Sequence, residues 1–551
     1  MRWQDACGCG CCCPRAGFGF GLAVVVGVLS VAQRSKLVLH CAHVVRDLAW
    51  SRGGTAVHRL LGGSSLYVYF AAGSRWPLPE VRRPARRQLL ITRTSYYGGE
   101  RLRDLPAVNL GGGVPTREYA HVVVQPRVTY QTWMGFGGSF TESSADLFAS
   151  ASLENQKLIM DAYFDEHLGL GYTLGRLHMN SCDFSGSSWS CDDSPDDIQL
   201  VNFSIQRYHR SILPMVRRAA ECAGRNLTLI ASPWSPPAWM KDTGRMVHGG
   251  SLLWKHHSTW ARFFVRFALE MKLAGVPLWG FTVQNEPDAV TPWENCYFSP
   301  RDELEFIRDF LGPALEASKL DLRLLFWDHN RDNMLLRAQT IYADPRAAEY
   351  VWGIGYHWYG DPRHEIWPDR SGQVSWDNVQ RVHELRPDKH IIMTEASQEF
   401  GPRIGDWATG ERYAEALIRD MNHWLEAWID WNLVLDETGG PNHVGNLVSA
   451  PVILDTARGQ VLHLPSYYYL AHFSRYIRPG AKRIAVGTNR DTLEATAFIN
   501  PDGVIVVVVL NRSIWPSEFL LLFPSMMSEV SVRLNAPAHS IQTLRLVDEP
   551  R

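Results

Sequence analysis

The chain has 551 residues, of which 46% are hydrophobic and 20% are charged. This composition can fill a sizeable core and excludes disorder of the whole chain, while the length exceeds one ordinary small domain and suits a large α/β barrel with a second module. The formal net charge of −2 produces no field that would attract nucleic acid, so no nucleic-acid partner is expected.

The N-terminal region carries an uncharged stretch, residues 16–33, whose apolar centre covers 17–32. That centre is shorter than the ~20 residues that a membrane-spanning helix needs. With small residues at Ser30 and Ala32, the pattern predicts a signal peptide over residues 1–32, and an uncleaved anchor is the alternative. Residues 33–87 show no regular pattern and include a basic cluster, which is compatible with a disordered, solvated linker.

Entry into the secretory pathway has two consequences for the sequence. It would make Asn202, Asn226 and Asn511 glycosylation acceptors, because each begins an Asn-X-Ser/Thr tripeptide. It would also allow Cys182 and Cys191 to close a short disulfide loop, although two free buried thiols are an equal alternative. Apart from the five cysteines crowded at residues 7–13, no CxxC pair or Cys/His cluster has zinc-ligand spacing, so neither a metal nor another cofactor is expected.

Short apolar runs and longer helical patterns alternate from about residue 133 to about residue 436, after strand-like sequence at 89–97 and 119–130. The runs are 134–140, 172–178, 227–231, 278–283, 322–327, 351–358, 390–394 and 428–435, and helices are predicted at 153–167, 260–273, 301–318 and 412–426. This alternation predicts a parallel (β/α)₈ barrel. An open doubly wound sheet is the alternative, and the polar residues that follow nearly every run disfavour it.

The helical pattern stops near residue 464. Apolar runs at 493–499, 504–510, 519–523, 530–534 and 541–546 then alternate with turn residues, which predicts an antiparallel, sandwich-like β module. Because the strands at 89–130 have no partner in the barrel, they are expected to join it. The predicted domains are therefore a barrel at 132–464 and one β domain built from 88–131 and 465–551.

Two glutamates follow predicted strands of the barrel. Glu286 follows the fourth run within Gln-Asn-Glu-Pro, and Glu395 follows the seventh run within Met-Thr-Glu-Ala. A single Glu at a strand end is often part of a structural ion pair, but two at the same barrel face provide what glycosidic cleavage needs. One carboxyl group protonates the leaving oxygen, and the other attacks or stabilises the sugar cation.

The two roles require opposite charge states. Burial and a second carboxylate nearby are expected to raise the pKa of Glu286, so that it holds its proton as a general acid. Glu395 must be ionised to act as the nucleophile, and Arg176 on the second run is a candidate to hold that charge. His357 and Tyr359, on and after the sixth run, are candidates to orient either carboxylate.

Other side chains after the barrel runs are candidates to bind a sugar. Asp183, Asn285 and Asn446 can hydrogen-bond to hydroxyl groups, and Trp234 and Trp431 can stack on a pyranose ring. Each has an ordinary alternative, since Asp is common in turns and helix caps and Trp is common in protein cores.

Eight sequence blocks occur in a fixed order along the chain. They are Gly-Phe-Gly-Gly-Ser-Phe-Thr-Glu, Asn-Ser-Cys-Asp-Phe-Ser, Ser-Pro-Trp-Ser-Pro-Pro-Ala-Trp-Met-Lys, Gln-Asn-Glu-Pro, Phe-Trp-Asp-His-Asn, Gly-Tyr-His-Trp-Tyr, Thr-Glu-Ala-Ser and Asp-Trp-Asn-Leu. Over residues 88–550 the chain resembles glycoside hydrolase family 30, and most of all its glucosylceramidase branch. The resemblance implies a retaining β-glucosidase that hydrolyses glucosylceramide.

The resemblance also implies a role for each candidate residue. Glu286 matches the family's acid/base and Glu395 its nucleophile. Five positions match glucose contacts, namely Asp183, Trp234, Asn285, Trp431 and Asn446. Three match supporting residues, namely Arg176, His357 and Tyr359.

The chain departs from the family's pattern outside these positions. Its first 85 residues have no counterpart, and the N-terminal disulfide-bearing segment of the animal enzymes is not visible. The loop after Glu286 is short, and His443 stands where the animal enzymes carry Trp. Since such loops border the site, they bear on lipid-tail preference and on whether an activator protein or an anionic lipid surface is a partner.

The catalytic pair leaves the substrate open among several glycans. A β-1,6-glucan or a xyloside is the alternative to a glycolipid, and a non-catalytic glycan-binding protein is a further class. The expected location is the secretory pathway, either in a lysosome-like compartment or outside the cell, with membrane association allowed.

Overall fold

The computed structural model describes residues 56–59, 65–68, 87–111, 119–360, 375–524 and 530–548. The chain divides into two units, residues 1–83 and 84–551. In the first unit, strands β1 (Ala56–Arg59) and β2 (Ser65–Val68) form an antiparallel pair. The predicted signal peptide and most of the predicted linker lie outside the described residues.

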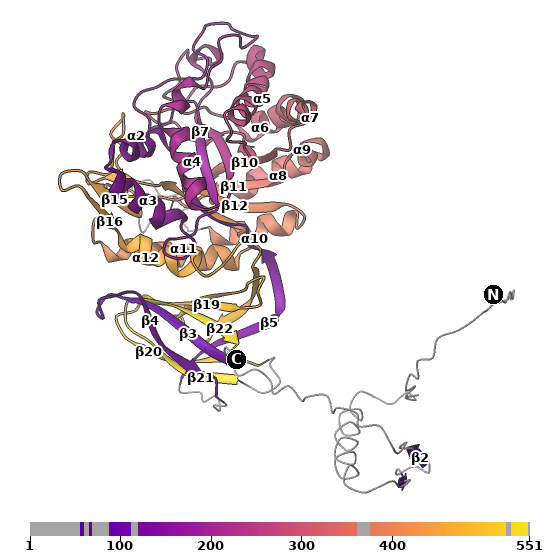
Figure 1. Cartoon of the computed structure of the whole chain (residues 1–551). Coiled ribbons are helices and arrows are strands. Elements are labelled where there is room, and N and C mark those ends of the chain that lie inside the picture. The colour runs from indigo at the N-terminus through magenta and orange to yellow at the C-terminus, as the bar shows by residue number, and fades with distance from the viewer. Residues whose placement is uncertain are drawn as a thin grey trace, which may run out of the picture. The chain divides into compact units, whose positions relative to one another are not determined.

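Eight parallel strands close a barrel in the second unit (Figure 1). They are β6 (Gly135–Ser139), β7 (Leu174–Met179), β8 (Thr228–Pro233), β9 (Gly280–Thr282), β10 (Arg323–Asn330), β11 (Gly353–His357), β12 (His390–Glu395) and β13 (Ala427–Asn432). They follow one another in chain order, and β13 pairs with β6 to close the ring. Strands such as β7 and β13 are buried along their whole length, which explains why each gave an apolar run rather than an alternating pattern. The predicted barrel is confirmed.

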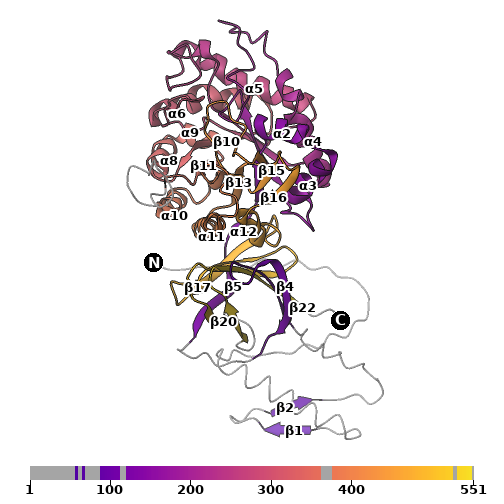
Figure 2. The same cartoon turned by 90° about the vertical axis from the view of Figure 1, so that its left-hand side faces the viewer.

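Helices surround the barrel strands (Figure 2). They are α2 (Glu142–Ser150), α3 (Leu153–Phe164), α4 (Ile212–Cys222), α5 (His257–Leu273), α6 (Pro300–Phe306), α7 (Gly312–Ser318), α8 (Met334–Ala343), α9 (Pro345–Tyr350), α10 (Trp376–Leu385), α11 (Trp407–Asn422) and α12 (Pro465–Ser474). Local sequence sets their ends. For example, the Ser299 hydroxyl accepts from the backbone N–H of Asp302, whose carboxylate accepts from the backbone N–H of Ser299, so that a capping box starts α6.

Strands from both ends of the chain form the second domain, a nine-stranded sheet in the order β21-β20-β5-β17-β18-β19-β22-β3-β4. Its strands are β3 (Arg87–Ser95), β4 (Glu100–Asn109), β5 (Ala120–Thr132), β17 (Lys482–Thr488), β18 (Glu494–Ile499), β19 (Ile505–Asn511), β20 (Ser517–Phe523), β21 (Val530–Ala536) and β22 (Ser540–Asp548). The sheet encloses a core of its own, which includes Val122, Val507 and Phe519. The pairs are antiparallel as predicted, except that β5 and β20 run parallel.

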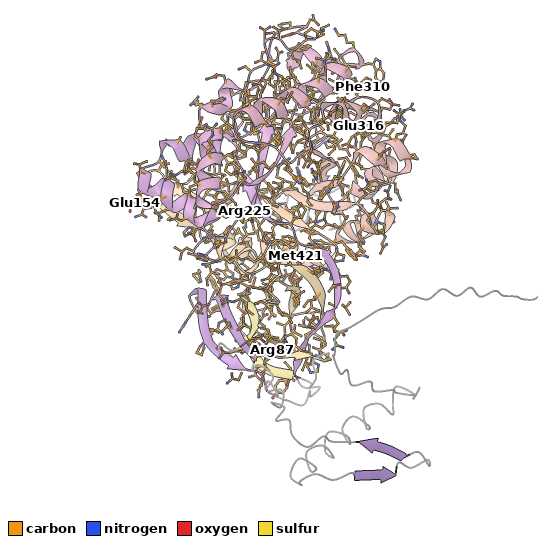
Figure 3. All side chains as sticks on the ribbon, turned by 45° about the vertical axis from the view of Figure 1, so that its right-hand side comes forward. Arg87, Glu154, Arg225, Phe310, Glu316 and Met421 are labelled. Atoms are coloured by element: carbon orange, nitrogen blue, oxygen red, sulfur yellow. The ribbon has the colours of Figure 1, made fainter. Side chains whose placement is uncertain are left out.

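The barrel and the sheet are joined by polar contacts. Gln131 of β5 donates to the carbonyl oxygens of Met421 and Leu425, at 2.7 and 2.9 Å, and Figure 3 shows Met421 at this junction. The imidazole of His472 on α12 lies 2.9 Å from the hydroxyls of both Thr94 and Thr543, which belong to β3 and β22. The two domains therefore form one continuous unit.

Three expectations about modification and location can be compared with the described residues. Cys182 and Cys191 are free and buried, so the disulfide alternative is wrong. Asn511 is fully buried, and its amide nitrogen donates to the carbonyl oxygens of Trp515, Ala536 and Pro537, so it cannot carry a glycan in the folded protein. None of the helices in the described ranges is both long and apolar enough to cross a membrane.

Candidate active site

Glu286 lies in a strained turn just beyond β9. Its backbone adopts a left-handed conformation with φ of 48°, which is uncommon for a residue other than glycine. The backbone N–H of Glu286 donates to the carbonyl oxygen of Asp328 at 3.0 Å, and Pro287 follows directly. Strain of this kind persists only where the surroundings fix it, and here the turn places the carboxyl group at the barrel mouth.

Glu395 is the last residue of β12, and only 7% of its surface is exposed. Both of its carboxylate oxygens accept hydrogen bonds. Arg176, from β7, donates to one oxygen, and the Tyr359 hydroxyl donates to the other at 3.0 Å. The barrel therefore holds this carboxylate through one side chain on β7 and one that follows β11.

The two glutamates face each other. A carboxylate oxygen of Glu286, a carboxylate oxygen of Glu395 and a ring nitrogen of His357 all lie within 4.8 Å of one another. Retaining glycosidases have carboxyl groups about 5–5.5 Å apart, whereas inverting enzymes need about 6.5–9.5 Å to fit a water molecule between carboxyl group and sugar. The separation therefore fits direct attack by one carboxylate. A cation could be held by three such groups, but each already has a hydrogen-bond partner in the protein.

Asp328, which the sequence prediction did not include, contacts Arg176 and His357, the residues that bond Glu395 and Glu286. Its fully buried carboxylate accepts from Arg176 at 2.9 Å, from Thr282 at 2.6 Å, and from the hydroxyl of Thr394. The imidazole Nε2 of His357 lies 3.0 Å from its other side. The one signal that could have revealed it is an acidic residue inside an apolar strand.

The electrostatics of this group follow from its contacts. His357 has a carboxylate at each ring nitrogen, Glu286 at 3.1 Å and Asp328 at 3.0 Å, so both nitrogens must donate and the ring is an imidazolium. Burial lowers the pKa of His357, but the negative charges of Glu395, Asp328 and Glu286 outweigh it and raise the pKa to about 9. Burial raises the pKa of Asp328, but Arg176 and His357 hold it far below its usual range.

Asp183 and Asn446 lie together, although 263 residues separate them in the sequence. The amide nitrogen of Asn446 donates to the Asp183 carboxylate at 2.9 Å. Burial raises the pKa of Asp183 to about 8, the amide of Asn446 opposes the rise, and the charges of Glu395, Glu294 and Glu286 add to it, so this carboxyl group lies near the catalytic pair. A protonated Asp183 can both donate to and accept from a sugar hydroxyl.

The tryptophans expected to stack on sugar pack largely against each other. The Trp234 and Trp431 rings are 5.2 Å apart at 24°, and 2% and 4% of their surfaces are exposed. The Arg176 guanidinium lies over both rings, 4.7 Å from one centroid and 5.5 Å from the other. Asn285 accepts from Arg176 at 2.8 Å. These residues are brought together, and their main contacts form a floor under Arg176.

Comparison with protein families gives two matches. Residues 133–477 match the glycosyl hydrolase family 30 TIM-barrel domain, and residues 480–544 match the family's β-sandwich domain. The chain belongs to glycosyl hydrolase family 30. The resemblance of the sequence blocks is thereby confirmed.

Individual relatives of this family 30 hydrolase include enzymes with different substrates. It is 36% identical to the lysosomal acid glucosylceramidase of Mus musculus over 71% of this chain and 77% of the mouse protein. It is 27% identical to an endo-1,6-β-D-glucanase of Neurospora crassa over 69% of this chain and 79% of that protein. Among solved structures, SrfJ from Salmonella typhimurium aligns with a TM-score of 0.77 and 30% identity, over 84% of this chain and 100% of SrfJ.

Proton placement in the free hydrolase differs from the sequence expectation. Burial raises the pKa of Glu395 above its usual range, and His357 and Arg176 counter only part of that rise. Burial also raises the pKa of Glu286, but the imidazoles of His329 and His357 outweigh it and lower the pKa overall. The difference arises because a second imidazole, that of His329, lies 3.8 Å from Glu286, and only His357 was expected there.

The hydrogen bonds fit the opposite arrangement, in which Glu395 is ionised and Glu286 carries the proton. Both oxygens of Glu395 accept from donors, which suits the ionised form. Within the described ranges, His357 is the hydrogen-bond partner of one Glu286 oxygen, and the other oxygen is left to carry a proton.

Proposed function

We propose that this hydrolase cleaves β-glucosides with retention of anomeric configuration, and that glucosylceramide is its substrate. The observation that carries the proposal is the separation of less than 4.8 Å between oxygens of Glu286 and Glu395. The similarity to the mouse glucosylceramidase supports the choice of glycolipid.

The proposed reaction has two displacements. An oxygen of Glu395 attacks the anomeric carbon while Glu286 gives its proton to the departing ceramide oxygen, so that a glycosyl-enzyme ester forms. Glu286 then takes a proton from a water molecule, whose oxygen attacks the same carbon and releases glucose and free Glu395. Arg176 and Tyr359 would hold the nucleophile in place before attack and after its release.

Binding of glucose would use polar groups that lie near the catalytic pair. Asp183 and Asn446 are placed to bind two hydroxyl groups, and the hydrogen bond between them fixes their spacing. Asn285 is held by Arg176 and would bind a hydroxyl next to the reacting carbon. The exposed parts of Trp234 and Trp431 would contribute only an edge to the sugar.

A mechanism-based inhibitor tests the proposal directly. A 2-deoxy-2-fluoro-β-glucoside should leave a stable adduct on the peptide that contains Glu395, and NMR of early product should show β-glucose. Glu395→Gln should abolish both labelling and turnover, while the control Glu154→Gln, on the outer helix α3 (Figure 3), should leave them unchanged. Labelling of another residue, or α-glucose as first product, would refute the mechanism.

A second candidate substrate is a β-1,6-glucan, favoured by the similarity to the Neurospora crassa glucanase. The catalytic pair serves both substrates equally, so the loops around the cleft must decide. Hydrolysis of fluorescent glucosylceramide compared with gentiobiose-type oligomers measures the preference. If kcat/KM is higher for the oligomers than for glucosylceramide, the substrate is the β-1,6-glucan and not the glycolipid.

We further propose that the hydrolase works in an acidic secretory compartment, where an anionic lipid surface or an activator protein presents the glycolipid. The signal-like N-terminal stretch supports entry into the secretory pathway. Exposed apolar side chains in the loops after β9 and β12 support contact with a lipid surface, since Val290 is 69% exposed and Phe400 is 53% exposed. Vesicles containing anionic lipid should raise the rate on glucosylceramide but not on a soluble glucoside.

A further inference from the structure

An ion pair that the catalytic scheme does not use lies beside Asp183. The imidazole of His443 is largely buried in the loop after β13, and its Nε2 lies 3.5 Å from a carboxylate oxygen of Glu294. Glu294 is fully buried in the loop after β9, and the same oxygen accepts from the Ser181 hydroxyl at 2.8 Å. His443, Glu294 and Ser181 therefore join the loops that follow β13, β9 and β7.

The other ring nitrogen of His443 holds the backbone of the β7 loop. Its Nδ1 lies 2.9 Å from the carbonyl oxygen of Asp183 and 3.0 Å from that of Ser185. Asn446 belongs to the same short loop as His443, and Asn442 ties the loop together by bonds to both the N–H and the carbonyl of Asn446. Movement of the imidazole would thus shift both members of the Asp183–Asn446 pair.

The partners of the His443 ring determine its charge. Carbonyl oxygens cannot donate, so Nδ1 must carry a hydrogen. Nε2 faces a carboxylate oxygen, which also only accepts when ionised, so a neutral imidazole would present a lone pair to a negative charge. Only the doubly protonated ring suits all three oxygens.

We propose that His443 and Glu294 are positioning residues, a charged clamp that holds Asp183 and Asn446 in place for the sugar as long as the imidazole is protonated. The clamp rests on the proposed function, because it acts through groups expected to bind glucose. His443 stands where the animal enzymes carry Trp, and an indole does not titrate. The clamp therefore makes the substrate affinity of this chain depend on pH through a residue that those enzymes lack.

The direction of the pH effect follows from the surroundings. The Glu294 carboxylate, 3.5 Å away, raises the pKa of His443, burial opposes the rise, and the carbonyls of Asp183 and Ser185 add to it. A His with a raised pKa stabilises the fold fully below its unfolded pKa of about 6.5, and this stabilisation is lost as pH rises through the folded pKa. The other titratable groups near the pair are the carboxyl group of Asp183, the Cys182 thiol, the Lys241 ammonium and the His178 ring.

Steady-state kinetics on a soluble aryl β-glucoside between pH 4 and 8 test the clamp. His443→Gln keeps a donor for the carbonyls but removes the charge, so KM at pH 5 should rise roughly tenfold while kcat changes less than about twofold. Glu294→Gln should move the alkaline rise in KM to lower pH, because the charge that stabilises the imidazolium is gone. His423→Gln, at another partly buried histidine whose ring bonds the carbonyl of Arg419, is the control and should match wild type.

A KM profile of His443→Gln that runs parallel to wild type at every pH would overturn the clamp. Thermal unfolding gives a second readout that needs no substrate. The midpoint difference between wild type and His443→Gln should be largest at pH 5 and should shrink by pH 9, and a constant difference would overturn the clamp as well. If wild type hydrolyses no β-glucoside, the proposed function fails, while the unfolding data still decide whether the clamp titrates.

Discussion

Replacement of Asp328 by asparagine should both destabilise the protein and disable the site. Each carboxylate oxygen of Asp328 accepts two bonds, one from Arg176 and one from Thr282 on one side, and one from His357 and one from Thr394 on the other. An asparagine offers one oxygen and an NH₂ group. Whichever way the amide is turned, its NH₂ faces two donors, and Arg176 and His357 lose a negative partner.

The expected cost can be worked from these contacts. Removing one member of a fully buried ion pair costs about 3–5 kcal/mol, because the partner charge stays buried. Arg176 keeps Glu395 and Asn285 as acceptors, which places the loss toward the lower end of that range. A loss of ~3 kcal/mol lowers the equilibrium constant for folding by about two powers of ten.

Urea-induced unfolding followed by intrinsic tryptophan fluorescence measures this loss, and kcat/KM on an aryl glucoside measures the effect on the site. The control is Asp491→Asn, an exposed aspartate in the loop before β18. An unfolding midpoint and a kcat/KM that both match the control would refute the role of Asp328 as the centre of the charge network. A lower kcat/KM with an unchanged midpoint would limit that role to catalysis.

Three further outcomes are expected. Glu286→Gln should lower kcat/KM by roughly 10²–10⁴ for an alkyl glucoside. The loss should be far smaller for a dinitrophenyl glucoside, because its leaving group needs no proton, and equal losses for the two substrates would contradict the role of Glu286 as the acid. Tyr359→Phe should lower kcat/KM roughly tenfold through loss of one hydrogen bond to the nucleophile, and unchanged kinetics would exclude that bond. In protein from a secreting host, peptide mapping should find glycans at Asn202 or Asn226 and none at Asn511, so an occupied Asn511 would contradict its burial.

Much of the fold was predictable because its signals are local. Each barrel strand is buried on both faces, so it appears in the sequence as a short apolar run whatever its partners are. Glu286 and Glu395 could be paired from sequence because parallel strands in a barrel bring all their carboxyl ends to one face. Their separation could not be predicted, since it depends on the left-handed turn at Glu286 and on the register shift between β11 and β12.

Features that depend on tertiary contacts escaped the sequence. Strand β4 is an edge strand with mostly exposed side chains, so it lacks an apolar pattern. Asp328 lies within β10, where the register to β11 shifts between Trp327 and His329, and nothing local shows that its carboxylate faces four donors. Trp234 and Trp431 have suitable positions for sugar stacking, but their contact with each other became visible only in the folded chain.

The position of β22 has a consequence for synthesis and for truncation. This strand, near the C-terminus, lies between β19 and β3, so β3 and its neighbour β4 have no route into the sheet until residues 540–548 leave the ribosome. A nascent chain must therefore keep an early hairpin unpaired while an entire barrel is translated. A late stop codon that removes β22 would expose two strand edges at once and leave His472 without its Thr543 partner, although every residue of the catalytic centre is still present.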